Sequence, residues 1–187
     1  IWTGREKTTS YADADYYVTE ESTVPKWQGG FGTKVRFYGF DLSVNCTYQL
    51  GGKTLDASYA SFMASPSSSL GGRNFHKDLL DAWTPENSTS NIPRFQYGDL
   101  YSSGTSTRFL TSSSYLNINN INFGYTFPTS ITKKLMLNSL RLYVACENVV
   151  YFSARKGFDP RLSYSSASNS TTYSPMRTIS GGLTVQF

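Results

Sequence analysis

The clearest feature of the sequence is a strict alternation of apolar and polar residues from Phe40 to Leu50. The even positions of this stretch are all apolar: Phe40, Leu42, Val44, Cys46, Tyr48 and Leu50. The odd positions are all polar. A period of two residues is that of a β-strand, because successive side chains point to opposite faces. The stretch therefore predicts a long β-strand with one apolar and one polar face.

Four further segments alternate in the same way. The segment from Trp27 to Phe37 is separated from the first only by Tyr38-Gly39, so we expect the two strands to form a hairpin. Between Tyr115 and Phe127 the apolar phase shifts by one residue at Asn119-Asn120, which predicts a β-bulge. The remaining segments cover 140–147 and 179–187. The sequence thus predicts an all-β chain with about five long antiparallel strands.

The length of these strands distinguishes between classes of β protein. At about 3.3 Å per residue and a tilt of about 40°, the first strand rises roughly 28 Å, close to the apolar band of an outer-membrane barrel, whereas soluble strands have about five or six residues. Short joins at Tyr38-Gly39 and 128–138 alternate with long joins at 51–114 and 151–174. Aromatic residues gather at both strand ends. Short periplasmic turns, long extracellular loops and aromatic girdles are typical of transmembrane β-barrels.

The composition agrees with this prediction and excludes other classes. Of 187 residues, 39% are hydrophobic and only 16% are charged, and the mean hydropathy is -0.37. No run of 18 apolar residues exists, so we expect no transmembrane helix. The net charge is +4, but the basic residues are dispersed, so we predict no nucleic-acid binding. Cys46 and Cys146 lack CxxC spacing, which excludes a disulfide scaffold and a cysteine zinc site.

The sequence does not indicate catalytic chemistry. The single histidine, His76, lies two residues from Asp78 and near no nucleophile motif. We interpret it as a solvated helix residue and predict no enzyme, no metal site and no cofactor. From Asn74 to Trp83, apolar residues recur at helical spacing. We predict a short amphipathic helix there, capped by Asn74, that packs into the core of its own loop rather than against a ligand.

Charged residues on the polar parity of the strands are more informative. They are Lys34, Arg36, Arg141, Glu147 and Arg177. In a barrel this parity faces the lumen, where charge is tolerated. We favour structural pairing with a plug inside the barrel for these residues, with direct substrate contact as the alternative. A weaker alternation from Leu55 to Ser61 predicts a strand that extends above the membrane.

Two other architectures are compatible with alternation alone. A soluble carbohydrate-binding β-sandwich or jelly roll buries its apolar faces against each other and needs about seven short strands. A small self-closed barrel with an adhesive or structural role needs about eight strands. Both require hidden strands within 51–114. Strand length, the alternation of short and long joins, and the aromatic girdles favour a section of a larger barrel.

Several motifs resemble the C-terminal part of SusC-like, RagA-like TonB-dependent transporters. They are PKWQGGF, YGFDLSV and YQLGG between Pro25 and Gly52, WTPEN at 83–87, SYLNINNINFGYTFP at 114–128, LRLYVACENV at 140–149 and KGFDP at 156–160. Their order and spacing match over residues 25–187, and jointly they are far more specific than any single motif. Residues 1–24 are expected to form an extracellular loop or the end of a preceding strand.

The resemblance implies a much larger molecule. Such transporters form barrels of about 22 strands that a plug closes. They import oligosaccharides or peptides through the outer membrane of Gram-negative, Bacteroidetes-like cells, with energy from TonB and a SusD-like lipoprotein as lid. The implied partners are the plug and the other strands, outer-membrane lipid, the TonB complex, the surface lipoprotein and the substrate. Five strands cannot close a barrel, which needs about eight, so we expect a barrel section.

The resemblance also points to individual residues. It directs ligand binding to the WTPEN and KGFDP loops, so Trp83, Phe158 and Asp159 are candidates for substrate contact. An aromatic ring stacks on a sugar with little loss of entropy, and a carboxylate orients the ligand. Phe187, an aromatic residue that ends an alternating strand, resembles the signal by which the assembly machinery recognises outer-membrane barrels.

Overall fold

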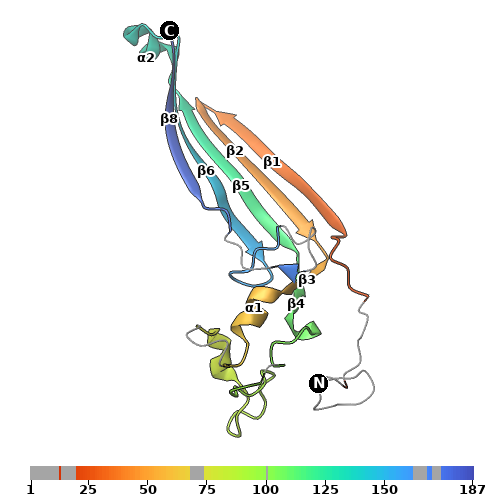
Figure 1. The fold of residues 1–187 in the computed structure, drawn as a ribbon. Helices are drawn as coiled ribbons and strands as arrows, with labels where there is room; N and C mark the ends of the chain where they lie inside the picture. Colours follow the sequence, from red (N-terminus) through yellow and green to blue (C-terminus); the bar gives the residue numbers. More distant parts are fainter. Residues whose placement is uncertain (1–12, 14–19, 68–73, 100, 162–167, 170–173) are drawn as a thin grey trace.

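The computed structural model describes residue 13 and residues 20–67, 74–99, 101–161, 168–169 and 174–187. Its main element is a five-stranded antiparallel sheet in which the strands follow one another in chain order (Figure 1). The strands are β1 (Trp27–Phe37), β2 (Phe40–Leu50), β5 (Tyr115–Thr126), β6 (Ser139–Ser153) and β8 (Thr178–Gln186). The prediction of five long antiparallel strands is confirmed.

The connections between these strands alternate in length. Tyr38 and Gly39 join β1 to β2 with φ angles of 46° and 87°. Positive φ at both central residues is the geometry of a two-residue hairpin turn whose twist matches its strands. A short segment with α2 (Thr129–Thr132) and the 3-10 helix η4 (Lys133–Leu135) joins β5 to β6. Figure 1 shows α2 beside the carboxyl terminus, at the end of the sheet opposite the long connections.

The long connections build a second, smaller sheet at the other end. In it β3 (Lys53–Asp56) pairs antiparallel with β4 (Leu110–Ser112) and parallel with β7 (Ser168–Asn169). Since β3 directly follows β2 and β4 directly precedes β5, the small sheet prolongs the middle of the large one (Figure 1). The strand β7 comes from the β6–β8 connection. Backbone pairing therefore ties the two long connections to each other.

The predicted strand from Leu55 to Ser61 is only partly correct. The strand ends at Asp56, and the helix α1 (Ala57–Phe62) begins at the next residue. The Asp56 carboxylate accepts a hydrogen bond from the backbone N–H of Tyr59 at 2.8 Å. Because this bond satisfies a free N–H of the first helical turn, it favours a helix start at this position over a continued strand.

The predicted amphipathic α-helix from Asn74 to Trp83 is also corrected. The structure has a five-residue 3-10 helix there, η2 (Lys77–Asp81), and its N-cap is His76 rather than Asn74. The His76 ring nitrogen Nδ1 accepts a hydrogen bond from the backbone N–H of Asp78 at 3.2 Å, which starts the helix later than predicted. Across the part of the chain that the structure describes, every helix is too short or too polar to cross a membrane.

A β-bulge interrupts the large sheet at one level in three neighbouring strands. The register between β2 and β5 shifts at Asn45/Cys46, and the register between β5 and β6 shifts between Ile118 and Asn120. On β6 the extra residues include Asn148, whose φ is 50°. The bulge predicted at Asn119-Asn120 is confirmed. It keeps the apolar residues on either side of it on the same face of the sheet.

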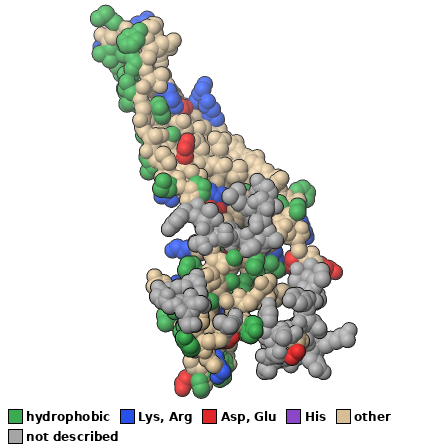
Figure 2. Space-filling model, viewed as in Figure 1, with side chains coloured by type: hydrophobic (Ala, Val, Ile, Leu, Met, Phe, Trp, Pro, Cys, Tyr) green, Lys and Arg blue, Asp and Glu red, His purple; other side chains and the backbone are tan. Residues whose placement is uncertain are grey.

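The apolar face of the large sheet is uncovered within the described residues. Phe31 on β1 and Val144 on β6 are 58% and 52% exposed. The buried hydrophobic residues lie instead in the long connections: Met63, Ala64, Ala82, Phe109 and Phe158. Exposed hydrophobic side chains also gather at the end of the molecule that carries α2 and the carboxyl terminus (Figure 2). The described sheet thus lacks the second layer that a β-sandwich requires.

The uncovered face generates a test. The sequence predicts that this face meets hydrocarbon, so Val44→Lys on β2 should lower the free energy of unfolding of the assembled barrel by about 2–4 kcal/mol. Ser43→Lys is the matched control, because it places the same charge one residue away on the opposite face. Urea titration of the full-length protein in bilayers measures both variants, with the folded fraction read from the difference in gel mobility between unheated and heated samples. Equal destabilisation by the two substitutions would contradict the assignment of the faces.

Candidate functional site

The charged residues predicted to face a lumen fall largely on one face of the sheet. Four of them lie within the strands: Lys34, Arg36, Arg141 and Glu147. In the register their opposite residues are all polar: Ser43, Asp41, Thr184 and Thr178. The fifth, Arg177, directly precedes β8. These residues therefore share the polar face or its border, and their exposure to a lumen stays a prediction.

An ion pair that the sequence did not reveal crosses this polar face. The guanidinium of Arg141 on β6 donates two hydrogen bonds to the carboxylate of Asp41 on β2, from Nε at 3.0 Å and from Nη2 at 2.6 Å. The strand β5 lies between the two and carries Gly124 at this point. A Cβ at Gly124 would lie 2.8 Å from both Arg141 Cζ and Asp41 Oδ1. The missing side chain of Gly124 is what lets the pair form across a strand.

A second cluster connects the two long connections through side chains. Asp56, at the start of α1, is buried and forms an ion pair with Arg155, which follows β6. The Arg155 guanidinium lies over the ring of Tyr59, with Cζ 3.7 Å from the ring centroid. The Tyr59 hydroxyl donates a hydrogen bond to Asp78 Oδ2 at 2.8 Å. Burial, together with this bond to Asp78, raises the pKa of Tyr59 to about 12. Tyr59 therefore stays neutral and keeps donating at ordinary pH.

The predicted ligand residue Asp159 is engaged in a third ion pair. Arg161 Nε lies 2.8 Å from Asp159 Oδ1, and Nη2 lies 2.5 Å from Oδ2. Burial alone would raise the pKa of Asp159, but the hydrogen bonds and charge of Arg161 outweigh it and hold that pKa below its usual range. Arg161 Cζ also lies 4.9 Å from the ring centroid of Tyr151. Asp159 thus holds the Arg161 side chain in place.

The other two predicted ligand residues differ in accessibility. Trp83 is 39% exposed, and its backbone N–H donates to the carbonyl of Ile92 at 2.8 Å. Phe158 is only 5% exposed and belongs to the core of the connections. The structure places Trp83 in the β2–β5 connection and Phe158 in the β6–β8 connection. Only Trp83 presents its ring to solvent.

His76 packs its ring edge-on against Tyr59, at 4.8 Å between centroids, and caps η2. The sequence interpretation of a solvated helix residue is therefore incomplete, because the ring has two defined contacts. In the described ranges no three His, Cys, Asp or Glu side chains are grouped as metal ligands. His76 contacts Tyr59, which in turn contacts Asp78 and Arg155.

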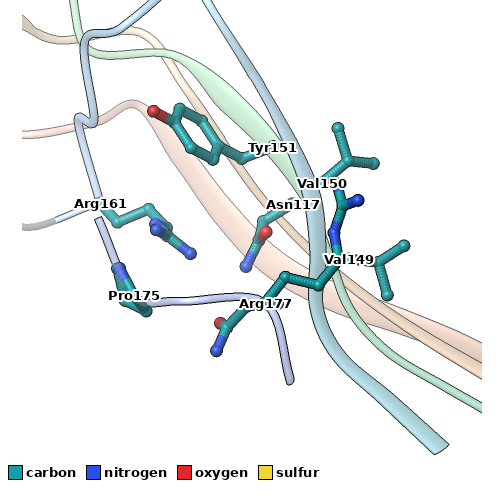
Figure 3. Close-up of a pocket in the computed structure, with 8 residues that line it drawn as sticks. Asn117, Val149, Val150, Tyr151, Arg161, Pro175 and Arg177 are labelled. Atoms are coloured by element: carbon teal, nitrogen blue, oxygen red, sulfur yellow. The ribbon is translucent and has the colours of Figure 1, made fainter. Parts of the chain in front are cut away.

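A cavity of about 280 Å³ lies beside the bulge (Figure 3). It combines residues of β5 and β6 with residues that precede β8. Its lining includes the predicted residue Arg177, together with Asn117, Tyr151 and Arg161. Of these, sequence reasoning singled out only Arg177. The others become neighbours through the strand register and the β6–β8 connection, which the sequence pattern does not reveal.

The Asp41–Arg141 pair gives a sharp substitution test. Gly124→Ala should lower the free energy of unfolding by about 1–3 kcal/mol, because the added methyl group overlaps the pair. Gly181→Ala on β8 is the matched control, since its Cβ would meet only the Tyr143 carbonyl oxygen at an ordinary 3.7 Å. Urea titration of the full-length protein measures both. In the Arg141→Ala background the effect of Gly124→Ala should largely vanish, and persistence of the full effect would contradict this account.

The cluster around Asp56 generates a second test. Asp56→Asn keeps an oxygen for the helix cap but removes the ion pair, so local opening of α1 should become easier by about 1–3 kcal/mol. Asp56→Ala also removes the cap and should add about 1 kcal/mol. Hydrogen exchange of the amides of residues 57–62 reports the opening. Lys53→Ala is the control, because its pair with Glu21 is exposed and should contribute little. Unchanged exchange in both Asp56 variants would refute the role of the pair.

The comparisons with known proteins agree with one another. No family model matches the sequence. Two relatives are named TonB-dependent receptors and come from Formosa agariphila. The receptor P3 is 27% identical over 173 residues, which are 87% of this chain and 16% of the receptor. The receptor P39 is 26% identical over 145 residues, which are 72% of this chain and 13% of the receptor.

Solved structures give the same answer for the fold. The RagAB peptide importer in its "closed-closed" state matches with a TM-score of 0.77 and 22% identity, over 96% of this chain and 19% of that one. In its "open-open" state the TM-score is 0.75 and the identity 23%, over the same shares. The chain therefore spans less than a fifth of the proteins it matches. Together with the two-faced sheet and its long connections, these matches show that the chain is similar to a part of TonB-dependent receptors and has the fold of a β-barrel section of the RagAB importer.

Proposed function

We propose that the chain forms part of the wall and the surface loops of an outer-membrane importer for oligosaccharides or peptides. In this proposal TonB supplies the energy, a plug closes the barrel, and a SusD-like surface lipoprotein covers the loops. The similarity to TonB-dependent receptors and to the fold of a peptide importer supports it. The cell is a Gram-negative bacterium of the Bacteroidetes type. The chain takes part in capture and passage, without catalysis or a cofactor.

The observation that carries the proposal is the asymmetry of the large sheet. One face is apolar and uncovered, whereas the other holds the Asp41–Arg141 pair with Lys34 and Arg36 nearby. A wall between hydrocarbon and a polar lumen needs this asymmetry, because the lipid side tolerates apolar groups and the lumen side tolerates charge. The strands β1 and β8 each have one unpaired edge within the described residues. In the proposal the other strands of the barrel pair with these edges.

The remaining predicted residues receive distinct roles in this proposal. Trp83 stacks on substrate, because its ring is accessible. Asp159 orients Arg161, and Phe158 supports the loop core from its buried position. Lys34, Arg36, Arg141 and Glu147 face the plug. Phe187 is 87% exposed and serves as the assembly signal.

The experiment that tests the proposal is uptake by intact cells. Cells that carry the full-length transporter should accumulate labelled oligosaccharides or peptides, and deletion of TonB should abolish this accumulation. Replacing the β6–β8 connection from residue 154 to residue 174 by a short Gly-Ser linker should lower uptake while the barrel still assembles. Uptake that is independent of TonB, or normal uptake by the loop variant, would overturn the proposal.

The role of Trp83 has its own prediction. Trp83→Ala should weaken substrate binding by the purified transporter about 5- to 100-fold, since loss of an aromatic stacking contact costs about 1–3 kcal/mol. Leu80→Ala is a matched control, because Leu80 belongs to the same connection and is 89% exposed. Isothermal titration with the imported substrate measures both affinities. Similar losses for the two variants would assign the effect to the loop as a whole and refute stacking on Trp83.

A further inference from the structure

The cavity beside the bulge has the features of a built ligand site. It opens where β5 and β6 depart from regular pairing, next to Asn148, which holds a φ of 50°. Asparagine tolerates this conformation better than most residues, yet the conformation is uncommon outside glycine. Bulges are frequent next to functional sites, because they re-aim side chains. Here the bulge places Asn117 and Tyr151 of the polar face around one hollow (Figure 3).

A buried acceptor inside this cavity lacks a donor. Asn117 is 6% exposed, and its Nδ2 donates to Asn119 Oδ1 at 2.6 Å. The Asn119 oxygen also accepts from Thr47 Oγ1 at 2.9 Å. Reversing the Asn117 amide alone would set two oxygens against each other, so the amides of Asn117 and Asn119 are oriented as a pair. Asn117 Oδ1 then has no hydrogen-bond partner among the described residues. An unsatisfied buried acceptor is unfavourable unless a ligand or water supplies a donor.

Two arginines, Arg161 and Arg177, line the cavity. Asp159 neutralises Arg161, but Arg177 is exposed and forms no ion pair within the described residues. Glu147 is a neighbouring carboxylate on β6, and the ion pairs of the described chain do not include it either. The other polar groups are internally bonded: Asn148 Nδ2 donates to the Met176 carbonyl at 3.2 Å, and the Tyr151 and Ser174 hydroxyls lie 3.2 Å apart. Arg177 is therefore the lining cation available to a ligand.

We propose that this cavity binds a carboxylate that carries a hydrogen-bond donor on a neighbouring atom. The inference rests on the proposed import function and names the chemistry of the cargo. Arg177 pairs with the carboxylate, and Asn117 Oδ1 accepts from the neighbouring hydroxyl or amide N–H. A volume of about 280 Å³ lies just below the range of whole drug-sized ligands, so the site holds one unit of a longer substrate.

Two sources supply this chemistry. A uronic acid unit of an acidic oligosaccharide has a ring carboxylate with hydroxyl groups beside it. The carboxyl-terminal residue of a peptide has a carboxylate beside its own amide N–H. Both present an anion together with a hydrogen-bond donor of the same unit, so the experiment must separate them. Neutral oligosaccharides and amidated peptides lack the anion and serve as matched probes.

The test is binding by the full-length transporter, purified in detergent, measured by isothermal titration. The probes are a galacturonic acid hexamer, its carboxyl-reduced neutral form, an alanine-glycine octapeptide and the same peptide with a carboxyl-terminal amide. One acidic probe should bind at least tenfold more tightly than its neutral form, and that probe identifies the source. Equal binding of an acidic probe and its neutral form, or no binding of either acidic probe, would overturn the proposal.

Variants of the cavity sharpen this test. Arg177→Gln should weaken the acidic probe about 10- to 100-fold and leave the neutral form unchanged. Arg94→Gln is the matched control, since Arg94 is an exposed arginine of the β2–β5 connection that does not line the cavity. Asn117→Asp puts a negative charge beside the bound anion and should also weaken the acidic probe by at least tenfold. Unchanged or tighter binding of the acidic probe by Asn117→Asp would contradict the proposal.

The binding test stays separate from the test of import. Binding in detergent needs neither TonB nor the plug motion, whereas uptake by cells needs both. If uptake depends on TonB but Arg177→Gln binds the acidic probe normally, the cavity proposal fails and the import function stands. If the acidic probe binds through Arg177 but uptake is independent of TonB, the import proposal fails while the site remains.

Discussion

The period of two residues in an extended chain is the constraint on which the whole structure depends. Each of the five strands sends alternate side chains to opposite faces, and the antiparallel ladder locks the strands to one another residue by residue. A slip by one residue in any strand would exchange its apolar and polar faces. The register instead brings every apolar run to one face and the Asp41–Arg141 pair to the other. Burial of one face against hydrocarbon would make that register the only stable one.

The regular alternation is interrupted at the bulge near Asn119, and the cavity lies beside it. Ile118 and Ile121 are three positions apart, so in a regular strand without a bulge they would point to opposite faces. The extra residue restores their phase, but it leaves Asn117 and Asn119 bonded to each other on the polar side. A polar amide seam is tolerated on a face that does not meet hydrocarbon. The same irregularity that preserves the apolar face therefore creates the hollow beside Arg177.

The sequence predicts the strands well and the connections poorly, for a physical reason. Alternation over eleven residues is a local signal, and so is the phase shift at Asn119-Asn120. The pairing of Arg141 with Asp41, of Arg155 with Asp56, and of β3 with β7 depends on residues about 100 positions apart in the chain. The end of β3 at Asp56 is set by a capping bond that weak alternation to Ser61 obscures. Phe158 likewise looks like a surface aromatic in its motif but is only 5% exposed.

The distribution of ion pairs changes how the net charge of +4 is understood. An aspartate holds each of three arginines, Arg141, Arg155 and Arg161. The first pair joins two strands, the second joins the two long connections, and the third stiffens one loop. Each of these arginines is held in place by its aspartate, and the carboxylate largely cancels the charge of the guanidinium. A ligand therefore meets the cations that remain unpaired near a cavity, rather than the average charge of the chain. Because Arg161 fixes one side of the hollow while Arg177 remains available, recognition there depends on the direction of one charge and one amide oxygen. A neutral probe of the same shape would lose the first of these contacts and keep the second.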